Sequence, residues 1–174
     1  MKPEWIEDVG FVPELVRLFM RCAEPVYICQ GELLDGRADS ISAWSKELPS
    51  LLARFFTETI ESGTAGIGER RGGILAVRCN EAILGFAVVE IYRFPHKRPH
   101  AFLHDIVVDP QDRGSGIGTA LMQNLKDELL GEGVDRLFLE SGTGNYRAHA
   151  FFNRHGFEQI SISMMADLGT AFPS

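Results

Sequence analysis

A glycine-rich turn in the middle of the chain has the residue types of an anion-binding site. An apolar run ends at residues 106–110 (IVVDP), and residues 113–118 (RGSGIG) lead into a stretch with helical periodicity. The free N–H groups of a helix's first turn and its dipole favour negative charge at that point. Glycines let the backbone approach an anion with no Cβ in between. The segment therefore predicts a site for a phosphate or diphosphate.

Two common phosphate-binding motifs do not fit this turn. A loop for nucleoside triphosphates closes with a lysine, whereas Gly118 is followed directly by Thr119. A dinucleotide-binding turn needs a third glycine at the position of Leu121, and it usually follows the first strand of the fold. Another class of anionic ligand is therefore needed.

Two sequence blocks resemble the GNAT superfamily of acyl-CoA-dependent N-acetyltransferases. The first is Arg113-x-x-Gly116-x-Gly118 after a Val-Asp-Pro strand end. The second, one helix and one strand later, is Asn145-x-x-Ala148-x-x-x-Phe152-x-x-x-Gly156-Phe157. The resemblance covers roughly residues 70–168. It implies an α/β (in stricter usage α+β) fold, with a mixed, mostly antiparallel sheet of six or seven strands and about four flanking helices.

The resemblance also implies where acetyl-coenzyme A (acetyl-CoA), the co-substrate, would bind. The backbone of the strand would pair with the pantetheine arm, the turn would hold the pyrophosphate, and the second block would contact the pantetheine from a helix. In order along the chain, the implied binding residues are Ile106, Val107, Val108, Arg113, Gly114, Ser115, Gly116, Ile117, Gly118, Thr119, Asn145 and Phe152.

Direct acetyl transfer to an amine needs a base, because an ammonium group must lose a proton before it attacks. Glu140 precedes Asn145 by five residues, as does the base in GNAT enzymes that acetylate ribosomal-protein N-termini. His104 and Asp105 are further candidates, and strand alternation predicts that they face opposite ways. Glu90 is another carboxylate on a predicted strand. The backbone amide of Val107 or Val108 is the expected donor to the oxyanion.

Phe152 departs from the family pattern. The family usually has a tyrosine there, whose hydroxyl protonates the leaving thiolate, and phenylalanine keeps the packing without the proton. Tyr146 is a poor substitute, since its helical position is turned about 240° from Phe152. A non-catalytic acyl-CoA-binding sensor is therefore an alternative to an N-acetyltransferase.

Apolar periodicity predicts the elements that position these residues. In chain order we expect helices at 12–22 and 43–60 with a loop at 31–42, strands at 74–78, 82–92 and 101–108, a helix at 116–130, a strand at 136–140, a short helix at 145–155 and an extended segment at 157–168. We interpret residues 1–174 as one N-acetyltransferase domain. Residues 1–65 would form its acceptor side and residues 70–168 its acetyl-CoA-binding core.

The composition of the chain restricts the classes of partner that the protein is expected to bind. The 174 residues carry a net charge of −7, which disfavours nucleic acid. No apolar run is long enough for a membrane span, no signal peptide is evident, and three cysteines match no disulfide framework, so we expect a cytoplasmic protein. His96, His100 and His104 lie on a proline-bounded, strand-like segment, so we expect no metal.

The expected acceptor is a small primary amine or amino-acid-like compound, with a protein N-terminus or lysine as the alternative. The first part of the chain is acidic, and if it lines the site it would favour a cationic ligand. A homodimer is a further expectation from the family resemblance.

Overall fold

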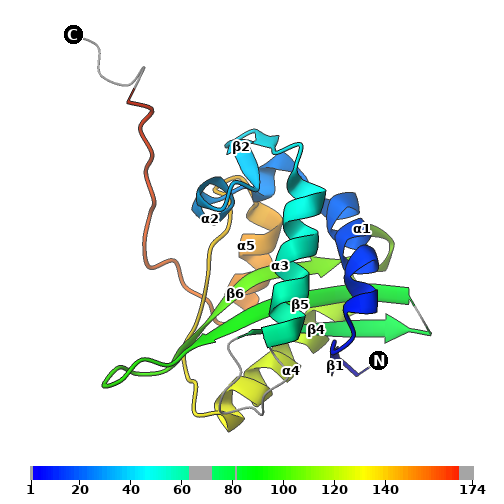
Figure 1. The fold of residues 1–174 in the computed structure, drawn as a ribbon. Helices are drawn as coiled ribbons and strands as arrows, with labels where there is room; N and C mark the ends of the chain where they lie inside the picture. The colour runs from blue at the N-terminus through cyan, green and yellow to red at the C-terminus, as the bar shows by residue number, and fades with distance from the viewer. Residues whose placement is uncertain (1, 63–71, 81, 169–174) are drawn as a thin grey trace.

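The computed structural model describes residues 2–62, 72–80 and 82–168 (Figure 1). Its helices are α1 (Val12–Cys22), α2 (Gln30–Leu34), α3 (Leu48–Ser62), α4 (Ile117–Gly131) and α5 (Tyr146–Arg154), with short 3-10 turns η1 (Val9–Phe11), η2 (Pro25–Tyr27) and η4 (Pro110–Asp112). Its strands are β1 (Glu4–Trp5), β2 (Ala38–Ser40), β3 (Ala43–Trp44), β4 (Gly72–Cys79), β5 (Ala82–Tyr92), β6 (His100–Val108) and β7 (Leu137–Leu139).

Five strands form the central sheet in the order β1-β4-β5-β6-β7. All neighbours are antiparallel except β6 and β7, which run parallel. The expectation of a mixed, mostly antiparallel α+β fold is confirmed. The other two described strands, β2 and β3, pair separately, and the described residues form five α-helices where about four were expected.

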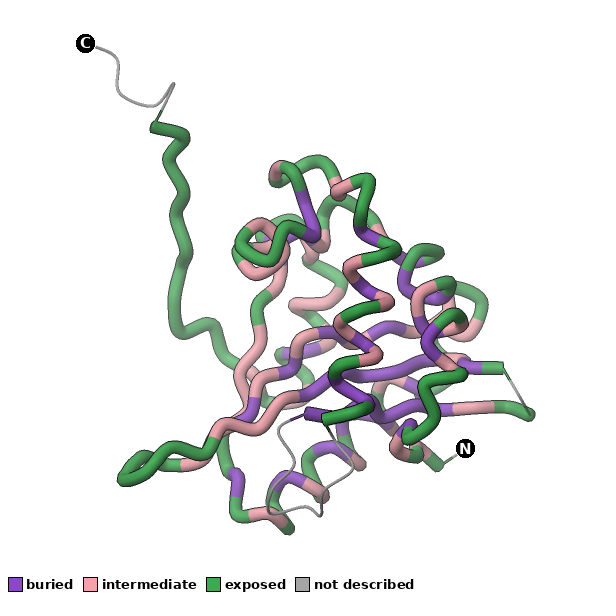
Figure 2. Tube along the Cα trace, in the orientation of Figure 1, coloured by how far each residue is buried: buried purple, intermediate pink, exposed green. Residues whose placement is uncertain are grey.

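Helices cover both faces of the sheet, and each face has its own apolar core. The α1/α3 face is filled by residues such as Leu18, Phe56 and Phe86. The α4/α5 face is filled by residues such as Leu75, Leu121 and Phe152. Figure 2 shows the buried residues concentrated in the strands between these layers. This two-sided burial explains why β4 and β5 are apolar nearly throughout instead of alternating.

The region before α3 differs from the expectation. The predicted helix at 43–60 begins only at Leu48, with Pro49 in its first turn, where a missing N–H costs nothing. Ala43–Trp44 instead forms β3, and Trp44 packs edge-on against Phe19 at 5.9 Å between ring centroids. The predicted loop at 31–42 contains α2 and β2.

The segment after α5, residues 157–168, is extended but belongs to no strand of the described chain. It leaves the body of the molecule beside α5 and is exposed along its length beyond Phe157 (Figures 1 and 2). We call residues 158–168 the C-terminal tail. Within residues 2–62, 72–80 and 82–168 the central sheet therefore has five strands instead of the predicted six or seven, and β7 lies at its edge.

Candidate active site

The two parallel strands β6 and β7 separate after only three residue pairs. Ala101, Phe102 and Leu103 pair with Leu137, Phe138 and Leu139. Beyond them, residues 105–108 of β6 pair with β5 only. The chain after β7 turns away instead, and Gly142 lies so close to η2 that a Cβ there would sit 2.3 Å from the Val26 carbonyl oxygen. One edge of β6 is thus left without a partner strand among the described residues.

That unpaired edge leads directly to the glycine-rich turn. Gly114 and Gly116 have φ angles of 90° and 92°, and a Cβ on either would meet nothing within 4 Å. No side chain caps the start of α4 at Gly116. The N–H groups of the first turn of α4 have no acceptor inside the helix, so they can donate to an anion. The turn thus has the geometry that the sequence predicted.

The other predicted binding residues make different kinds of contact in the structure. Arg113 Nε donates to the Val108 carbonyl oxygen at 3.4 Å, which places its guanidinium between the strand end and the turn. Asn145 caps α5, accepting from the Ala148 amide at 3.3 Å through its side-chain oxygen. Phe152 is buried in the α4/α5 core against Phe157. The Phe152 side chain therefore contributes to the packing of this core.

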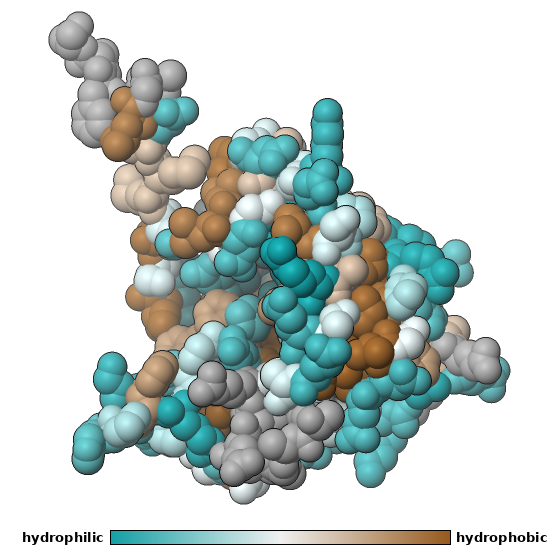
Figure 3. Space-filling model, viewed as in Figure 1, coloured by the Kyte–Doolittle hydropathy of each residue, from teal (hydrophilic) through white to brown (hydrophobic). Residues whose placement is uncertain are grey.

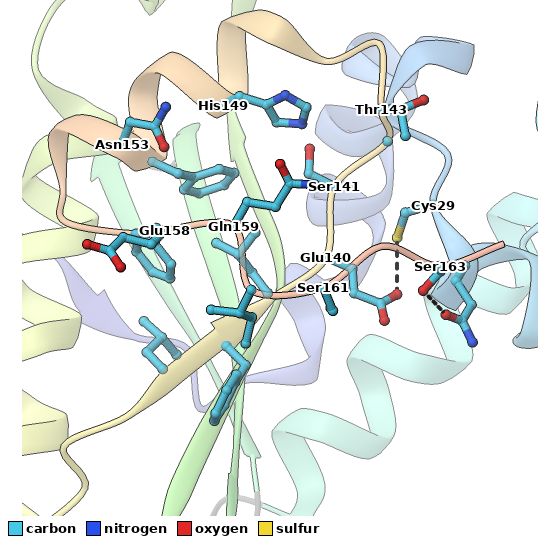
Figure 4. Close-up of a pocket in the computed structure, with 18 of the residues that line it drawn as sticks. Cys29, Glu140, Ser141, Thr143, His149, Asn153, Glu158, Gln159, Ser161 and Ser163 are labelled. Atoms are coloured by element: carbon cyan, nitrogen blue, oxygen red, sulfur yellow. Dashed lines mark hydrogen bonds between the residues drawn. The ribbon is translucent and has the colours of Figure 1, made fainter.

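Glu140 directly follows β7 at the point where the strands separate. Its Oε2 accepts a hydrogen bond from the Gly31 amide at 3.0 Å and lies 3.5 Å from Cys29 Sγ. Figure 4 shows the carboxylate directed toward Cys29, beside Ser161 of the tail. Among the hydrogen bonds of the described residues none uses Oε1. An exposed carboxylate with one oxygen held and the other open can accept a proton.

His104 and Asp105 do not face opposite ways. Val88 pairs with Asp105 and Val89 pairs with Leu103, so His104 is an extra residue in β6, a β-bulge. The His104 ring lies 5.6 Å from the Phe55 ring, and the Asp105 partner Arg37 stacks 4.6 Å from that same ring. Both side chains are therefore on the α1/α3 face. The predicted alternation was wrong here because a bulge interrupts it.

Asp105 is a buried ion-pair partner. Its carboxylate accepts hydrogen bonds from Arg37 at 3.2 and 3.3 Å, and both side chains are less than a tenth exposed. The planar guanidinium offers several N–H donors in a rigid fork, so it holds the Asp105 carboxylate in a fixed place. Such a group is suited to anchoring β2 over the sheet more than to exchanging protons with a substrate.

His104 belongs to a partly exposed polar chain on the sheet. Its Nε2 lies 3.2 Å from a Glu90 oxygen, which also accepts from the Tyr92 hydroxyl at 2.6 Å. Burial, followed by the bond to Glu90, raises the pKa of Tyr92 to about 12, so Tyr92 keeps its proton. Leu103 pairs with Leu139, so His104 and Glu140 come one residue beyond the same point on neighbouring strands.

The contacts of α2 with Glu140 were not predicted from the sequence. Cys29 is the N-cap of α2: its amide and thiol donate to Glu32, at 2.9 and 2.8 Å. A Ser or Thr followed three residues later by Glu would have signalled this capping box, but cysteine is not a usual cap. The contact between Gly31 and Glu140 joins residues 109 positions apart, which no local pattern encodes.

The same contacts predict the order in which the cysteines react. Burial raises the pKa of the Cys29 thiol, and the neighbouring Glu32 carboxylate raises it further. Only the thiolate is alkylated, so at about pH 8.5 iodoacetamide should modify the exposed Cys79 at least about tenfold faster than Cys29. Peptide mass spectrometry over time measures both rates. Equal rates would mean that the α2 cap opens in solution.

Neither a membrane span nor a metal site is found in the described part of the chain. None of the described helices has both the length and the apolar character needed to cross a bilayer. In residues 2–62, 72–80 and 82–168, no three His, Cys, Asp or Glu side chains are grouped so as to hold a metal ion.

An α+β fold whose parallel strands separate beside a glycine-rich helix start is the arrangement that the family resemblance implies for an acyl-CoA site. The family model described as "Acetyltransferase (GNAT) family" matches residues 37–157. The chain belongs to this family of acetyl-CoA-dependent N-acetyltransferases.

Individual relatives match smaller parts of the chain. The [Ribosomal protein bS18]-alanine N-acetyltransferase of Escherichia coli strain K12 is 34% identical over 83 residues, which are 48% of this chain and 53% of that protein. The chain thus spans about half the length of this relative.

Solved structures match nearly the whole chain at low identity. A transcriptional regulator from Bacillus halodurans has a TM-score of 0.67 at 16% identity, covering 96% of this chain and 99% of that one. Glucosamine-6-phosphate N-acetyltransferase from Arabidopsis thaliana has a TM-score of 0.61 at 16% identity, covering 97% and 99%. These likenesses establish the fold alone.

Proposed function

We propose that this chain transfers the acetyl group of acetyl-CoA directly to a primary amine, with Glu140 as the base. The observation that carries the proposal is the position of Glu140. It stands where β6 and β7 separate, with Oε2 fixed by the Gly31 amide and Oε1 open. A base must be within reach of the ammonium proton, and the end of this gap is where amine and thioester would meet.

Acetyl-CoA fits the gap and the turn together. Its pantetheine arm would pair with the free edge of β6 at residues 106–108, and its diphosphate would lie on the amides of residues 114–119. Arg113 would neutralise the diphosphate from the strand end. Asn145 keeps its side-chain N–H groups available for the pantetheine, because only its oxygen is used in the cap.

The register of β6 distinguishes the two candidate oxyanion donors. The Asp109 amide bonds to the Leu84 carbonyl on β5. Amides alternate along an antiparallel strand, so Val107 also points to β5, while Val108 points to the gap. The Val108 carbonyl accepts from Arg113 and lies 3.6 Å from the Cys22 thiol, which agrees with that orientation. We assign the donor role to the Val108 amide.

The reaction then consists of a proton transfer followed by replacement of the C–S bond of the thioester by a C–N bond. Glu140 accepts a proton from the ammonium, and the neutral amine attacks the thioester carbonyl to form the C–N bond. As the C–S bond breaks, coenzyme A leaves as the thiolate, and the nitrogen gives its second proton to water to become the neutral amide. Phe152 offers no proton to it, since it is a buried ring in the α4/α5 core. The thiolate takes its proton from water.

We propose a small amine or amino-acid-like acceptor that enters from the α1/α3 face, where Glu90, His104 and Tyr92 lie. A protein N-terminus is the second candidate. It is favoured by the Escherichia coli relative, whose name describes an N-acetyltransferase acting on an alanine of ribosomal protein bS18.

The test is release of free coenzyme A thiol from acetyl-CoA by the wild-type chain. The panel contains polyamines, free amino acids, amino sugars and a short peptide that begins with alanine. Amine-dependent release supports an N-acetyltransferase, and the best acceptor decides between the two substrate classes. Binding of acetyl-CoA without release for any member would favour the sensor, and absence of binding would overturn the proposal.

The turn itself predicts a binding defect. Gly116 has a φ of 92°, and a valine there would strain the turn and place methyl groups beside the diphosphate. Gly116→Val should weaken acetyl-CoA binding at least about tenfold by calorimetry, which corresponds to about 1.4 kcal/mol. Gly131→Ala, at the other end of α4 with open space around it, is the matched control and should bind normally. If both variants bound acetyl-CoA with equal affinity, the diphosphate would not bind at this turn.

A further inference from the structure

Part of the α1/α3 face of the central sheet extends beyond α3. Figure 1 shows α3 crossing β5 and β6, while both strands continue past it toward their hairpin. Directly paired residues of neighbouring strands share a face, so the registers of β5, β6 and β7 identify the side chains that lie there. Most of them are aromatic: Tyr92 on β5, His100, Phe102 and His104 on β6, and Phe138 on β7. We call these five residues the aromatic strip.

The rings of the aromatic strip contact one another and form a continuous surface. Tyr92 and His100 stack with 5.3 Å between ring centroids, and the Phe138 ring meets His100 edge-on at 5.8 Å. Phe102 and His104 lie 5.1 Å apart. All five residues are half-buried, so each keeps part of its surface accessible, and Figure 3 shows the molecule hollowed beside α3. The face of an aromatic ring attracts a cation.

Three carboxylates border the aromatic strip. Glu90 lies beside it with 37% of its side chain exposed, and among the hydrogen bonds of the described residues none uses its Oε1. Asp35 is the C-cap of α2. Burial and the bond to Glu90 raise the pKa of the Tyr92 hydroxyl, and the charge of Asp35 raises it further, so Asp35 lies near the same ring. Glu140 follows β7 with its own Oε1 open. Carboxylates beside aromatic rings favour a bound cation.

An ammonium group of the chain itself already packs at the outer end of the aromatic strip. Lys97 Nζ lies 5.5 Å from the centre of the Phe94 ring, and that ring stacks on Tyr92 at 6.3 Å. At the other end, the charge of Arg37 is balanced by the buried Asp105 carboxylate. Between these two ends, the rings and the carboxylates offer an equivalent place to the cation of a ligand.

We propose that the aromatic strip selects an acceptor with a second positive charge, such as a linear diamine or polyamine. The amine to be acetylated would lie beside Glu140, and the distant ammonium group would lie on the rings beside Glu90. The inference rests on the proposed function, because it concerns the acceptor of that reaction. It narrows the small amines to those with a cation at the far end, since Glu90 and Asp35 would repel a carboxylate there.

The spacing of the two glutamates suits such a ligand. Glu90 is paired with Phe102, which is paired in turn with Phe138. Glu140 follows Phe138 by two residues, so alternation along the chain puts it on the same face. Two strand spacings and two residues place the Cα atoms of the two glutamates on the order of 12 Å apart. An extended molecule of 1,6-diaminohexane bridges the remaining distance between the carboxylates, with one ammonium group at each end.

The first test compares acceptors of equal chain length that differ in the charge of the distant group. For the wild-type chain, kcat/KM for 1,6-diaminohexane should exceed that for hexylamine at least about tenfold, and 6-aminohexanoate should be acetylated more slowly than hexylamine. Equal values for the three acceptors would overturn the inference and leave the N-acetyltransferase standing.

The second test removes the charge of Glu90. Glu90→Gln keeps the shape of the side chain and should lower the ratio of kcat/KM for 1,6-diaminohexane to that for hexylamine at least about fivefold. Asp127→Asn removes the same charge from an exposed position of α4, on the other face of the sheet, and should keep the wild-type ratio. An unchanged ratio in Glu90→Gln, or an equal loss in both variants, would overturn the inference. Circular dichroism verifies that each variant is folded.

Binding of a dication that cannot be acetylated separates this inference from the proposed function. Hexamethonium carries two quaternary ammonium groups and no N–H, and calorimetry in the presence of coenzyme A measures its dissociation constant. Glu90→Gln should raise this constant at least about tenfold, and Asp127→Asn should leave it within about twofold. If hexamethonium binds in this way but no amine is acetylated, the dication site stands and the proposed transfer fails. Absence of hexamethonium binding to the wild type, or equal binding to Glu90→Gln, overturns the dication site.

Discussion

Replacing Glu140 by glutamine is expected to lower the rate of amine-dependent thiol release about a hundredfold, the scale of losing a general base. Glutamine keeps the size of the side chain, and its amide oxygen can still accept the Gly31 hydrogen bond. It cannot take a proton from the ammonium. The dissociation constant of acetyl-CoA should stay within about twofold, because Glu140 lies outside the glycine-rich turn.

His104→Gln is the matched control for this variant. His104 lies near the same point of the sheet but is bonded to Glu90, so its replacement should cost much less than that of Glu140. A larger loss of rate in His104→Gln than in Glu140→Gln would instead make the chain of His104, Glu90 and Tyr92 the route of the proton.

The second large effect concerns stability. Asp105→Asn leaves the Arg37 guanidinium buried without its counter-charge, and breaking such a pair costs about 3–5 kcal/mol. The free energy of unfolding from urea denaturation should fall by that amount. The exposed pair between Glu4 and Arg78 is the control, since Glu4→Gln should cost less than about 1 kcal/mol.

Replacing both charges distinguishes a structural from a catalytic role for Asp105. Arg37→Leu/Asp105→Leu removes the pair together, so much of the stability lost in Asp105→Asn should return. Any transfer activity that Asp105→Asn loses together with its stability should also return in the double variant. An Asp105→Asn variant that is as stable as the wild type but inactive would instead make Asp105 the base.

Features set by local patterns could be predicted from the sequence. The strand ending in Val-Asp-Pro, the glycine-rich turn and the helix after it follow from apolar periodicity and from glycine at positions of positive φ. Helix α1 and the hairpin of β4 and β5 follow in the same way, with Asn80 at a φ of 56° in the turn.

Features set by contacts between distant residues could not be predicted. The bulge at His104 depends on the register of β6 against β5, and one extra residue moved Asp105 to the face of Arg37. The position of Glu140 was available from its spacing to Asn145, but its contact with the Gly31 amide was not. The C-terminal segment shows the same limit: it was expected to be extended and is, but it pairs with no strand of the described chain.

The most direct test of the account is hydrogen exchange of the wild-type chain with and without acetyl-CoA. We propose that acetyl-CoA lies along the free edge of β6 and on the start of α4. Exchange should therefore slow at the amides of Ile106 and Val108 and at residues 114–119, and it should not change in β1 or β4. Protection confined to other residues, or none in these two segments at saturating acetyl-CoA, would contradict the account.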